Sequence, residues 1–213
     1  MPRPRQVGTQ PALSRAMVTA MNVALRVPMT LAEFLDWEDR QELRYEFDGL
    51  QPIAMTGGTR AHAAIQRNLA IALGTRLRGK PCQFFGSDLK IEVDGSIRYP
   101  DGFVTCMPGA PGDKLAGGPV VIFEGLSAST TGTDTVVKNR EYAKTPSIRR
   151  YIILAQDVMG GTMFERVGDE WVGHILDTDS LIRMPELDVE VPIAEFYEGV
   201  ELPPPSKEDK RPD

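Results

Sequence analysis

Two acidic residues and a lysine are the part of this sequence best suited to carry out a reaction. Asp101 comes directly after Tyr99–Pro100, Glu124 closes the apolar run 119–123, and Lys138 follows in a polar segment. Carboxylate oxygens are the ligands that hard cations such as Mg²⁺ and Mn²⁺ prefer. An ammonium group can stabilise the charge that develops on a phosphate. If the acids lie on neighbouring strands, the three side chains predict a metal-dependent site that cleaves phosphodiester bonds.

Each of these three residues also has a simpler interpretation. Asp101 follows Pro100, which lacks an N–H and marks a strand edge or bulge, so the acid can be an ordinary turn residue. Glu124 can be a surface glutamate at a strand end, although it must be paired if it is buried. Lys138 can be a solvated lysine on a polar helix. The predicted chemistry therefore depends on whether the fold brings the three side chains together.

Two further residues are secondary candidates for the site. Glu46 begins a predicted strand beside the first helix and can complete an acidic cluster. His62 lies on the apolar side of a predicted helix, where a core histidine is the commoner interpretation and a catalytic histidine the alternative. His174 is interpreted as structural. The sequence has no Walker phosphate loop, no zinc-type Cys/His spacing and no nucleophile elbow, so the chemistries that need them are not expected.

Turn signals and hydrophobic periodicity predict the elements that position these residues. Thr30 and Glu33 form a capping-box pattern, which predicts a helix from Leu31. Asp48–Gly49 predicts a hairpin in which both turn residues have positive φ, and Asp94–Gly95 predicts another. The remaining predictions are a helix over 60–77 with Ile65, Leu69, Leu73 and Leu77 on its buried face, a helix over 134–143, a mobile loop over 107–118, and strands over 83–85, 88–93, 97–104, 120–123, 150–154, 162–167 and 170–175. The sum is an α+β domain with a mixed central sheet and helices packed on it.

Length and composition limit the class of protein. The chain has 213 residues, 41% of them hydrophobic and 25% charged, which suits one soluble globular domain. No apolar run approaches the roughly 20 residues that span a bilayer. Two cysteines, Cys82 and Cys106, suggest no disulfide framework, so we expect a reduced cytoplasmic setting. The net charge of −6 excludes a protein that coats nucleic acid through a broad basic surface.

The ends of the chain differ from its middle in composition. Residues 1–27 contain arginines and no acid, which leaves open a transit peptide, a flexible extension, or a start placed ahead of the true one near Met29. Residues 28–200 are predicted to form the domain. Residues 201–213, with three consecutive prolines and a charged end, are predicted to be a disordered tail.

A series of motifs in this sequence resembles one family. The series is Thr30–Leu35, Tyr45–Phe47 with Asp48–Gly49, His62, Tyr99–Asp101, Glu124–Thr130, Lys138, Tyr142 and Tyr151–Ile153. It resembles the Uma-type putative restriction endonucleases of bacteria, a branch of the PD-(D/E)xK nuclease superfamily, over about residues 28–200. The resemblance implies a restriction-endonuclease-like core, with a mixed sheet flanked by helices after an N-terminal helix and hairpin. It also implies an endonuclease that hydrolyses DNA with Mg²⁺ or Mn²⁺.

The resemblance also implies roles for individual residues. Asp101 matches the first acid of the family motif and Glu124 the second, and both would hold the metal ion. The motif lysine should stand two residues after the glutamate, where this sequence has Leu126. In this branch a lysine from the following helix takes that role, and Lys138 matches it. Glu46 matches the acid that precedes the core hairpin.

Two departures from the family pattern favour an alternative function. Gly102 and Gly125 stand where the branch usually has valine, and they are expected to loosen the strands beside the carboxylates. The alternative is a catalytically silent nuclease-fold module with a binding or regulatory role, which the acidic net charge also favours. The expected partners are DNA as substrate and, as an option, a second copy in a homodimer; no membrane is expected.

Overall fold

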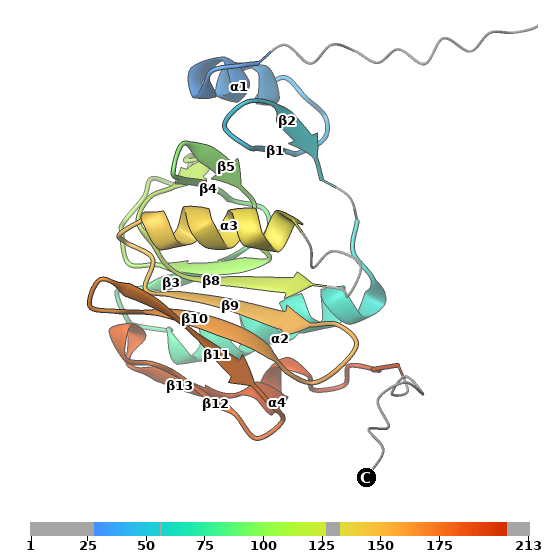
Figure 1. The fold of residues 1–213 in the computed structure, drawn as a ribbon. Coiled ribbons are helices and arrows are strands. Elements are labelled where there is room, and N and C mark those ends of the chain that lie inside the picture. The colour runs from blue at the N-terminus through green and yellow to red at the C-terminus, as the bar shows by residue number, and fades with distance from the viewer. Residues whose placement is uncertain (1–27, 56, 127–132, 204–213) are drawn as a thin grey trace, which may run out of the picture.

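The computed structural model describes residues 28–55, 57–126 and 133–203 (Figure 1). Residues 1–27, 56, 127–132 and 204–213 lie outside the described residues. They include the N-terminal segment 1–27 and most of the predicted tail 201–213, so those predictions stay predictions. The first described element is the helix α1, Leu31–Glu38, which has the predicted capping box between Thr30 and Glu33.

The strands form two larger sheets and a small one. The first sheet has the order β2-β1-β5-β4-β7, and the second has the order β11-β10-β9-β8-β6-β3. In the second sheet β8 and β9 run parallel while the other neighbours are antiparallel, so the predicted mixed sheet is confirmed. The strands are β1 Tyr45–Phe47, β2 Pro52–Ala54, β3 Gln83–Gly86, β4 Lys90–Val93, β5 Ser96–Arg98, β6 Gly102–Thr105, β7 Leu115–Ala116, β8 Pro119–Leu126, β9 Arg150–Ala155, β10 Gly161–Val167 and β11 Glu170–Leu176.

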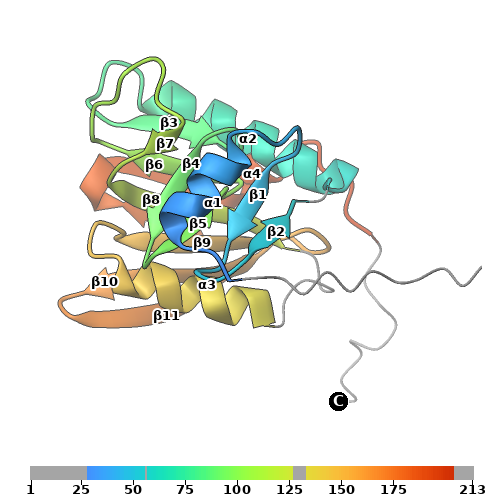
Figure 2. The ribbon, with the colours of Figure 1, turned by 90° about the horizontal axis from the view of Figure 1, so that it is seen from above.

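Two long helices cover opposite faces of the six-stranded sheet (Figures 1 and 2). They are α2, Arg60–Arg76, and α3, Thr133–Lys144. Successive strand residues point to opposite faces, so Val121 and Phe123 pack in the cluster on α2, while Ile122 packs with Tyr142 of α3. The predicted apolar stripe of α2 is confirmed, because Ile65, Leu69, Leu73 and Leu77 are all buried.

A C-terminal unit that the sequence analysis did not anticipate closes the α2 face. The strands β12, Leu181–Met184, and β13, Val189–Pro192, pair antiparallel, and a short helix α4, Ile193–Phe196, follows. A turn of 3₁₀ helix, Pro185–Leu187, connects the two strands. Ile182, Val191 and Phe196 are fully buried against α2 and the sheet, so this unit completes the main core.

Several predicted elements need correction. The single strand predicted over 97–104 is wrong, because Tyr99–Asp101 separates β5 from β6, which belong to different sheets. The prediction of positive φ at both residues of Asp48–Gly49 is also wrong, since only Gly49 has it. At Asp94–Gly95 both residues do have positive φ, at 47° and 80°. The segment 107–118, predicted to be a mobile loop, contains the short strand β7, which pairs with β4.

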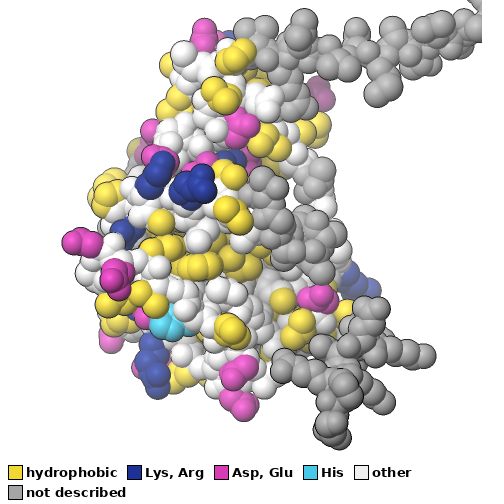
Figure 3. All heavy atoms as spheres, in the orientation of Figure 1, with side chains coloured by type: hydrophobic (Ala, Val, Ile, Leu, Met, Phe, Trp, Pro, Cys, Tyr) yellow, Lys and Arg dark blue, Asp and Glu magenta, His cyan; other side chains and the backbone are white. Residues whose placement is uncertain are grey.

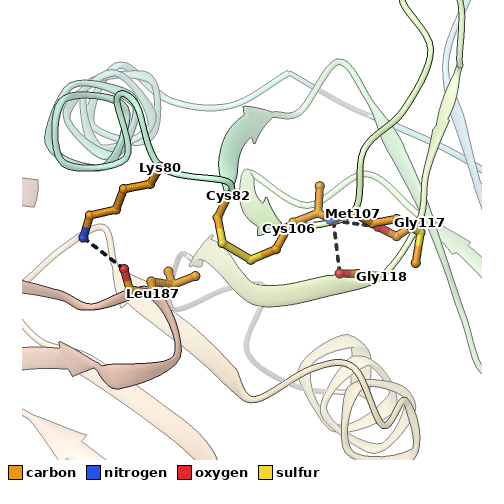
Figure 4. Close-up of a disulfide and its surroundings, with 8 residues drawn as sticks. Lys80, Cys82, Cys106, Met107, Gly117, Gly118 and Leu187 are labelled. Carbon is orange, nitrogen blue, oxygen red and sulfur yellow. Dashed lines mark hydrogen bonds between the residues drawn. A yellow bond between two sulfur atoms is a disulfide. The ribbon is translucent and has the colours of Figure 1, made fainter.

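The expectation of two unpaired cysteines is wrong. Cys82 and Cys106 form a disulfide that links the start of β3 to the end of β6 (Figure 4). The strand register explains it: Gln83 lies opposite Thr105, so the next residues outward, Cys82 and Cys106, face each other. They are 24 residues apart in the sequence, and the pairing depends on this register rather than on any cysteine motif.

The surface of the α3 side is partly apolar. Figure 3 shows hydrophobic side chains between α3 and the β10–β11 hairpin, and Ile175 at the edge of the sheet is 89% exposed. The optional homodimer stays a prediction.

No helix among the described residues has the length and hydrophobicity needed to cross a membrane.

Candidate active site

The sheet register brings Asp101 and Glu124 to the same place. β6 and β8 are antiparallel neighbours with Gly102 opposite Phe123, so Asp101 and Glu124 are the next residues outward on the two strands. Glu124 does not end its strand as predicted, because β8 continues to Leu126. Both acids line a cavity of about 290 Å³, together with Glu46, His62, Lys138 and other residues. All the candidates chosen from the sequence therefore meet at one site.

Glu124 is a buried acid on the α3 side of the sheet. Its Oε1 accepts hydrogen bonds from Lys138 Nζ at 3.1 Å and from the Tyr142 hydroxyl at 3.4 Å. The pKa of Glu124 is raised to about 7, chiefly because the group is buried; Lys138 opposes the increase, and Asp101 and Glu46 add to it. A carboxyl group in such surroundings is typical of functional sites.

Lys138 does not extend into solvent. It lies on α3 with only 8% of its surface exposed, and besides Glu124 its Nζ donates to Glu46 Oε1 at 3.2 Å. The interpretation of Lys138 as a solvated lysine is therefore wrong. By contrast, Lys144 on the same helix has a side chain that is 58% exposed and pairs with Asp94.

Glu46 is held from the other side by the strand β5. Its Oε1 accepts the backbone N–H of Tyr99 at 3.1 Å, and its Oε2 accepts Arg98 NH1 at 3.3 Å. Glu46 comes from the middle of β1, in the five-stranded sheet, whereas Glu124 comes from the six-stranded sheet. Lys138 thus joins acids from both sheets at a single amine.

Asp101 is held by the α2 side of the molecule. Its Oδ1 accepts the Gln66 side-chain amide at 2.7 Å, and its Oδ2 accepts the backbone N–H of Gly125 at 2.7 Å. His62 Nε2 lies 2.7 Å from the same Oδ2. Asp101 is therefore held by α2 and by β8, the strand that carries Glu124, whereas the Glu124 side chain is held by α3.

His62 belongs to the site and not to the hydrophobic core. It stands in the first turn of α2, where its backbone N–H donates to the N-cap hydroxyl of Thr59, and its side chain is 18% exposed. The hydrogen bond with Asp101 raises the pKa of His62, although burial opposes the increase. The core-histidine interpretation is wrong. His174, interpreted as structural, lies on β11 and pairs with Glu165 at 2.9 Å.

The sequence analysis missed a second layer of polar residues. Glu141, one turn after Lys138 on α3, accepts two hydrogen bonds from Arg98, at 2.6 and 2.8 Å, and one from Ser96. Burial lowers the pKa of Arg98, but Glu141 and Glu46 more than reverse this effect, so Arg98 stays charged. Glu141 follows Lys138 by three residues and Gln66 follows His62 by four, so each lies on the same helix face as a candidate residue. This spacing is the sequence signal that could have identified them.

Another missed residue, Gln156, ties the ends of three elements together. It follows β9, and its amide donates to the Gly125 carbonyl at 2.7 Å while its Oε1 accepts the Thr59 hydroxyl at 2.7 Å. These bonds fix the start of α2 against the end of β8. A second cavity, of about 430 Å³, shares His62 and Asp101 with the first and extends toward Arg44.

The two glycines beside the acids do not loosen the strands as expected. A Cβ on Gly102 would lie 2.6 Å from the Phe84 ring, and a Cβ on Gly125 would lie 3.0 Å from His62 Cδ2. Each glycine leaves space that a neighbouring side chain fills. The predicted loosening is therefore wrong, and the strands are packed at both positions.

The charges of the site suit a cation. The Lys138 amine pairs with Glu46 and Glu124, and Asp101 lies beside Glu124 on the adjacent strand. Burial is the main cause of the raised pKa of Glu124, and the charges of Asp101 and Glu46 add to it. Within the described ranges no group of three or more His, Cys, Asp or Glu side chains is arranged to hold a metal ion. Mg²⁺, however, is usually bound by one or two carboxylates and keeps several waters. The oxygens of Asp101 and Glu124 fit that donor set.

Comparison with known proteins agrees with this geometry. A family model described as "Putative restriction endonuclease", Uma2, matches residues 31–194, which is most of the chain. The chain belongs to the Uma2 family. Two uncharacterized proteins of Synechocystis sp. (strain ATCC 27184 / PCC 6803 / Kazusa) are similar to this Uma2 protein. One is 27% identical over 172 residues, covering 79% of this chain and 90% of the relative; the other is 27% identical over 158 residues, covering 71% and 89%.

A solved structure has the same fold as this Uma2 protein. It is described as a putative nuclease belonging to DUF820 from Anabaena variabilis, with a TM-score of 0.67 over 82% of this chain and 100% of the other. The two sequences are 18% identical, so the likeness concerns the fold. It confirms the predicted restriction-endonuclease-like α+β architecture.

Proposed function

We propose that this Uma2 protein is an endonuclease that hydrolyses phosphodiester bonds of DNA with Mg²⁺ or Mn²⁺. One observation carries the proposal: the buried Glu124 shares the Lys138 amine with Glu46, directly beside Asp101 on the adjacent strand. Glu46, Asp101, Glu124 and Lys138 all line one cavity, and the pKa of the buried Glu124 is raised. Such perturbed groups in clefts are candidates for function.

Asp101 and Glu124 are the residues that would hold the metal ion. Lys138 and Tyr142 both contact Glu124 Oε1, so in the described part of the chain Oε2 is the oxygen left for a cation. The bound ion would supply Lewis-acid chemistry, which activates water and polarises the phosphate. Glu46 contacts the same Lys138 amine as Glu124, and it would either stabilise this metal site or bind a second ion.

Lys138 would act on the reacting groups directly. Its amine lies between two acids and borders the cavity, so it can position the attacking water or neutralise charge on the phosphate. The Asp101 and Glu124 side chains come from elements fixed by hydrogen bonds to α2 and α3, which preserves their separation when a substrate enters. The adjoining cavity toward Arg44 provides space for the strand that carries the phosphate.

A plasmid assay with matched variants tests this function. Supercoiled plasmid is incubated with the purified protein in Mg²⁺, in Mn²⁺ or in EDTA. The wild type should nick it only with metal, and Asp101→Asn and Glu124→Gln should abolish nicking while their thermal unfolding stays cooperative. Asp36→Asn is the matched control, because Asp36 is exposed on α1 and pairs with Arg40, away from the cavity. Equal nicking by the two site variants and the wild type refutes the assignment.

The alternative, a catalytically silent nuclease-fold module with a binding or regulatory role, has one observation in its favour. No preassembled group of three ligand side chains exists among the described residues, and Lys138 already neutralises part of the acidic charge. Calorimetric titration with Mn²⁺ separates the two functions. A silent module should bind no ion at Asp101, whereas the nuclease should bind one, and Asp101→Asn should remove that binding.

The proposed setting is the cytoplasm, where DNA is accessible. The Cys82–Cys106 disulfide is unusual for a reducing compartment. Alkylation of free thiols in the protein as extracted from cells, followed by mass spectrometry, tests the setting. Two alkylated cysteines support the cytoplasm, and an intact disulfide argues against it.

A further inference from the structure

The imidazole of His62 occupies a narrow slot between two glycines. A Cβ on Gly58 would lie 2.0 Å from His62 Nδ1, and a Cβ on Gly125 would lie 3.0 Å from Cδ2. A side chain at Gly58 would force the ring to move, and one at Gly125 would crowd it. Gly57, next to Gly58, has nothing within 4 Å of such a Cβ, so the close approach is specific to the two glycines that face the ring.

The slot directs the ring at one atom. His62 Nε2 lies 2.7 Å from Asp101 Oδ2, which also accepts the Gly125 N–H, and Gln66 donates to Oδ1. His62 and Gln66 are four residues apart on α2, so one face of this helix contacts both oxygens of the carboxylate. The carboxylate thus accepts one hydrogen bond from the helix and one from the strand β8, and the imidazole lies in ion-pair contact with it.

We propose that His62 is a positioning residue, which fixes the rotamer of the Asp101 carboxylate from a slot formed by Gly58 and Gly125. This inference rests on the proposed function, because it assigns His62 to the first metal-binding acid. Groups that orient a metal ligand commonly contribute 10- to 100-fold to metal affinity. The slot also accounts for Gly125, since a larger residue there would push the imidazole away from Asp101.

Metal binding measures the effect of the ring. In calorimetric titrations with Mn²⁺, we expect His62→Ala and Gly58→Ala each to weaken binding by about 10-fold or more. The double variant should be no weaker than His62→Ala, because the slot matters only when the ring is present. His62→Gln, which can place an amide donor near the position of Nε2, should retain most of the affinity. Gly57→Ala and His174→Ala are the matched controls and should bind Mn²⁺ like the wild type.

The backbone amide of Gly125 provides a readout that needs neither metal nor activity. It donates to Asp101 Oδ2, so its NMR resonance reports where the carboxylate lies, and Asp101→Ala defines the shift when the acceptor is lost. We expect His62→Ala and Gly58→Ala to move this resonance a large part of that way, and His62→Gln and Gly57→Ala to leave it near the wild-type position.

The outcomes separate this inference from the proposed function. If the wild type binds no Mn²⁺ at all, the metal-dependent function fails, and the amide shift still decides whether His62 positions Asp101. If His62→Ala leaves the Gly125 resonance unmoved, or binds Mn²⁺ as tightly as the wild type or more tightly, the positioning role is refuted. Tighter binding would mean that the ring acts on the site only as a nearby positive charge.

Discussion

Two groups of buried charges lie side by side on the same elements and differ in their balance. In the first, Arg98 of β5 makes two hydrogen bonds with Glu141 of α3. In the second, Lys138 of α3 faces Glu46 and Glu124, with Asp101 close to Glu124. Both groups are deeply buried, and α3 contributes to each.

The difference teaches which group stabilises the fold and which is suited to chemistry. The Arg98–Glu141 pair matches one cation with one acid in a two-bond geometry, the arrangement that best repays the desolvation of buried ions. The Lys138 group has more acids than amines, even though Glu46 also accepts a bond from Arg98. Lys138 only partly offsets the effects of burial, Asp101 and Glu46, and the pKa of Glu124 is raised to about 7. Such a surplus costs stability, and a bound cation would relieve it.

The largest effect is expected when the amine of Lys138 is removed from the second group. Lys138→Met should lower the rate of metal-dependent plasmid nicking by about 10²- to 10³-fold, the loss usually seen when one preorganised charge-stabilising group is removed. The measurement is the single-turnover rate at saturating Mg²⁺. Lys144→Met on the same helix is the control and should keep the wild-type rate, because Lys144 pairs with Asp94 away from the cavity. Equal losses in both variants would mean that α3, and not the Lys138 amine, is responsible.

Breaking the first group should instead affect stability. Arg98→Met leaves Glu141 buried without its cation and should reduce the free energy of unfolding by about 3–5 kcal/mol. Urea denaturation followed by tryptophan fluorescence measures it. Replacing both partners, as Arg98→Met with Glu141→Leu, should recover much of this loss, since apolar residues of similar volume can substitute for a buried pair. A double variant as unstable as the single one would show that Arg98 acts mainly through Glu46.

Sequence patterns predicted the elements of this fold because local signals determine them. The capping box at Thr30, the four-residue stripe of α2 and the Asp94–Gly95 turn each depend on neighbouring residues alone, and each was confirmed. The break at Tyr99–Asp101 was not predicted, because strand propensity does not indicate which sheet a strand joins. The β12–β13 hairpin was not predicted either, because its turn, residues 185–188, contains no Gly. The residue with left-handed backbone conformation there is Asp188.

The candidate site was predictable in its members but not in its connections. Asp101, Glu124 and Lys138 stood out by residue type and position, and the structure brings them together. Arg98 and Glu141 did not stand out, since a buried charge cannot be told from an exposed one until the burial is known. The disulfide likewise depends on the register of β3 against β6, which no local pattern encodes.

Removing the disulfide tests whether stability and chemistry are separate along one strand. β6 begins next to Asp101 and ends next to Cys106, so the crosslink and the acid lie at opposite ends. Cys82→Ser with Cys106→Ser should lower the free energy of unfolding by about 3 kcal/mol, from the loop entropy that the crosslink removes. Mn²⁺ affinity should stay at the wild-type level. A parallel fall in affinity would show that the far end of β6 controls the position of Asp101.

The smallest expected effect concerns the pH dependence of stability and uses Glu124 itself. Its pKa is raised in the folded protein to about 7, from a model-compound value of 4.5. Between these values the folded state binds more protons than the unfolded state, so the free energy of unfolding should fall as pH rises through this window. The full fall is on the order of 3 kcal/mol, and other titrating groups overlap with it.

The pKa of His62 is also raised, which gives a fall of the same sign above pH 6.5. Glu124→Gln removes the contribution of Glu124 and largely keeps that of His62. The free energy of unfolding is therefore measured by urea denaturation from pH 4.5 to 8 for the wild type and the variant, and the difference between the two profiles isolates Glu124. Parallel profiles would mean that the pKa of Glu124 is not raised in the folded protein, and that the Lys138 group does not differ from the Arg98–Glu141 pair in this respect.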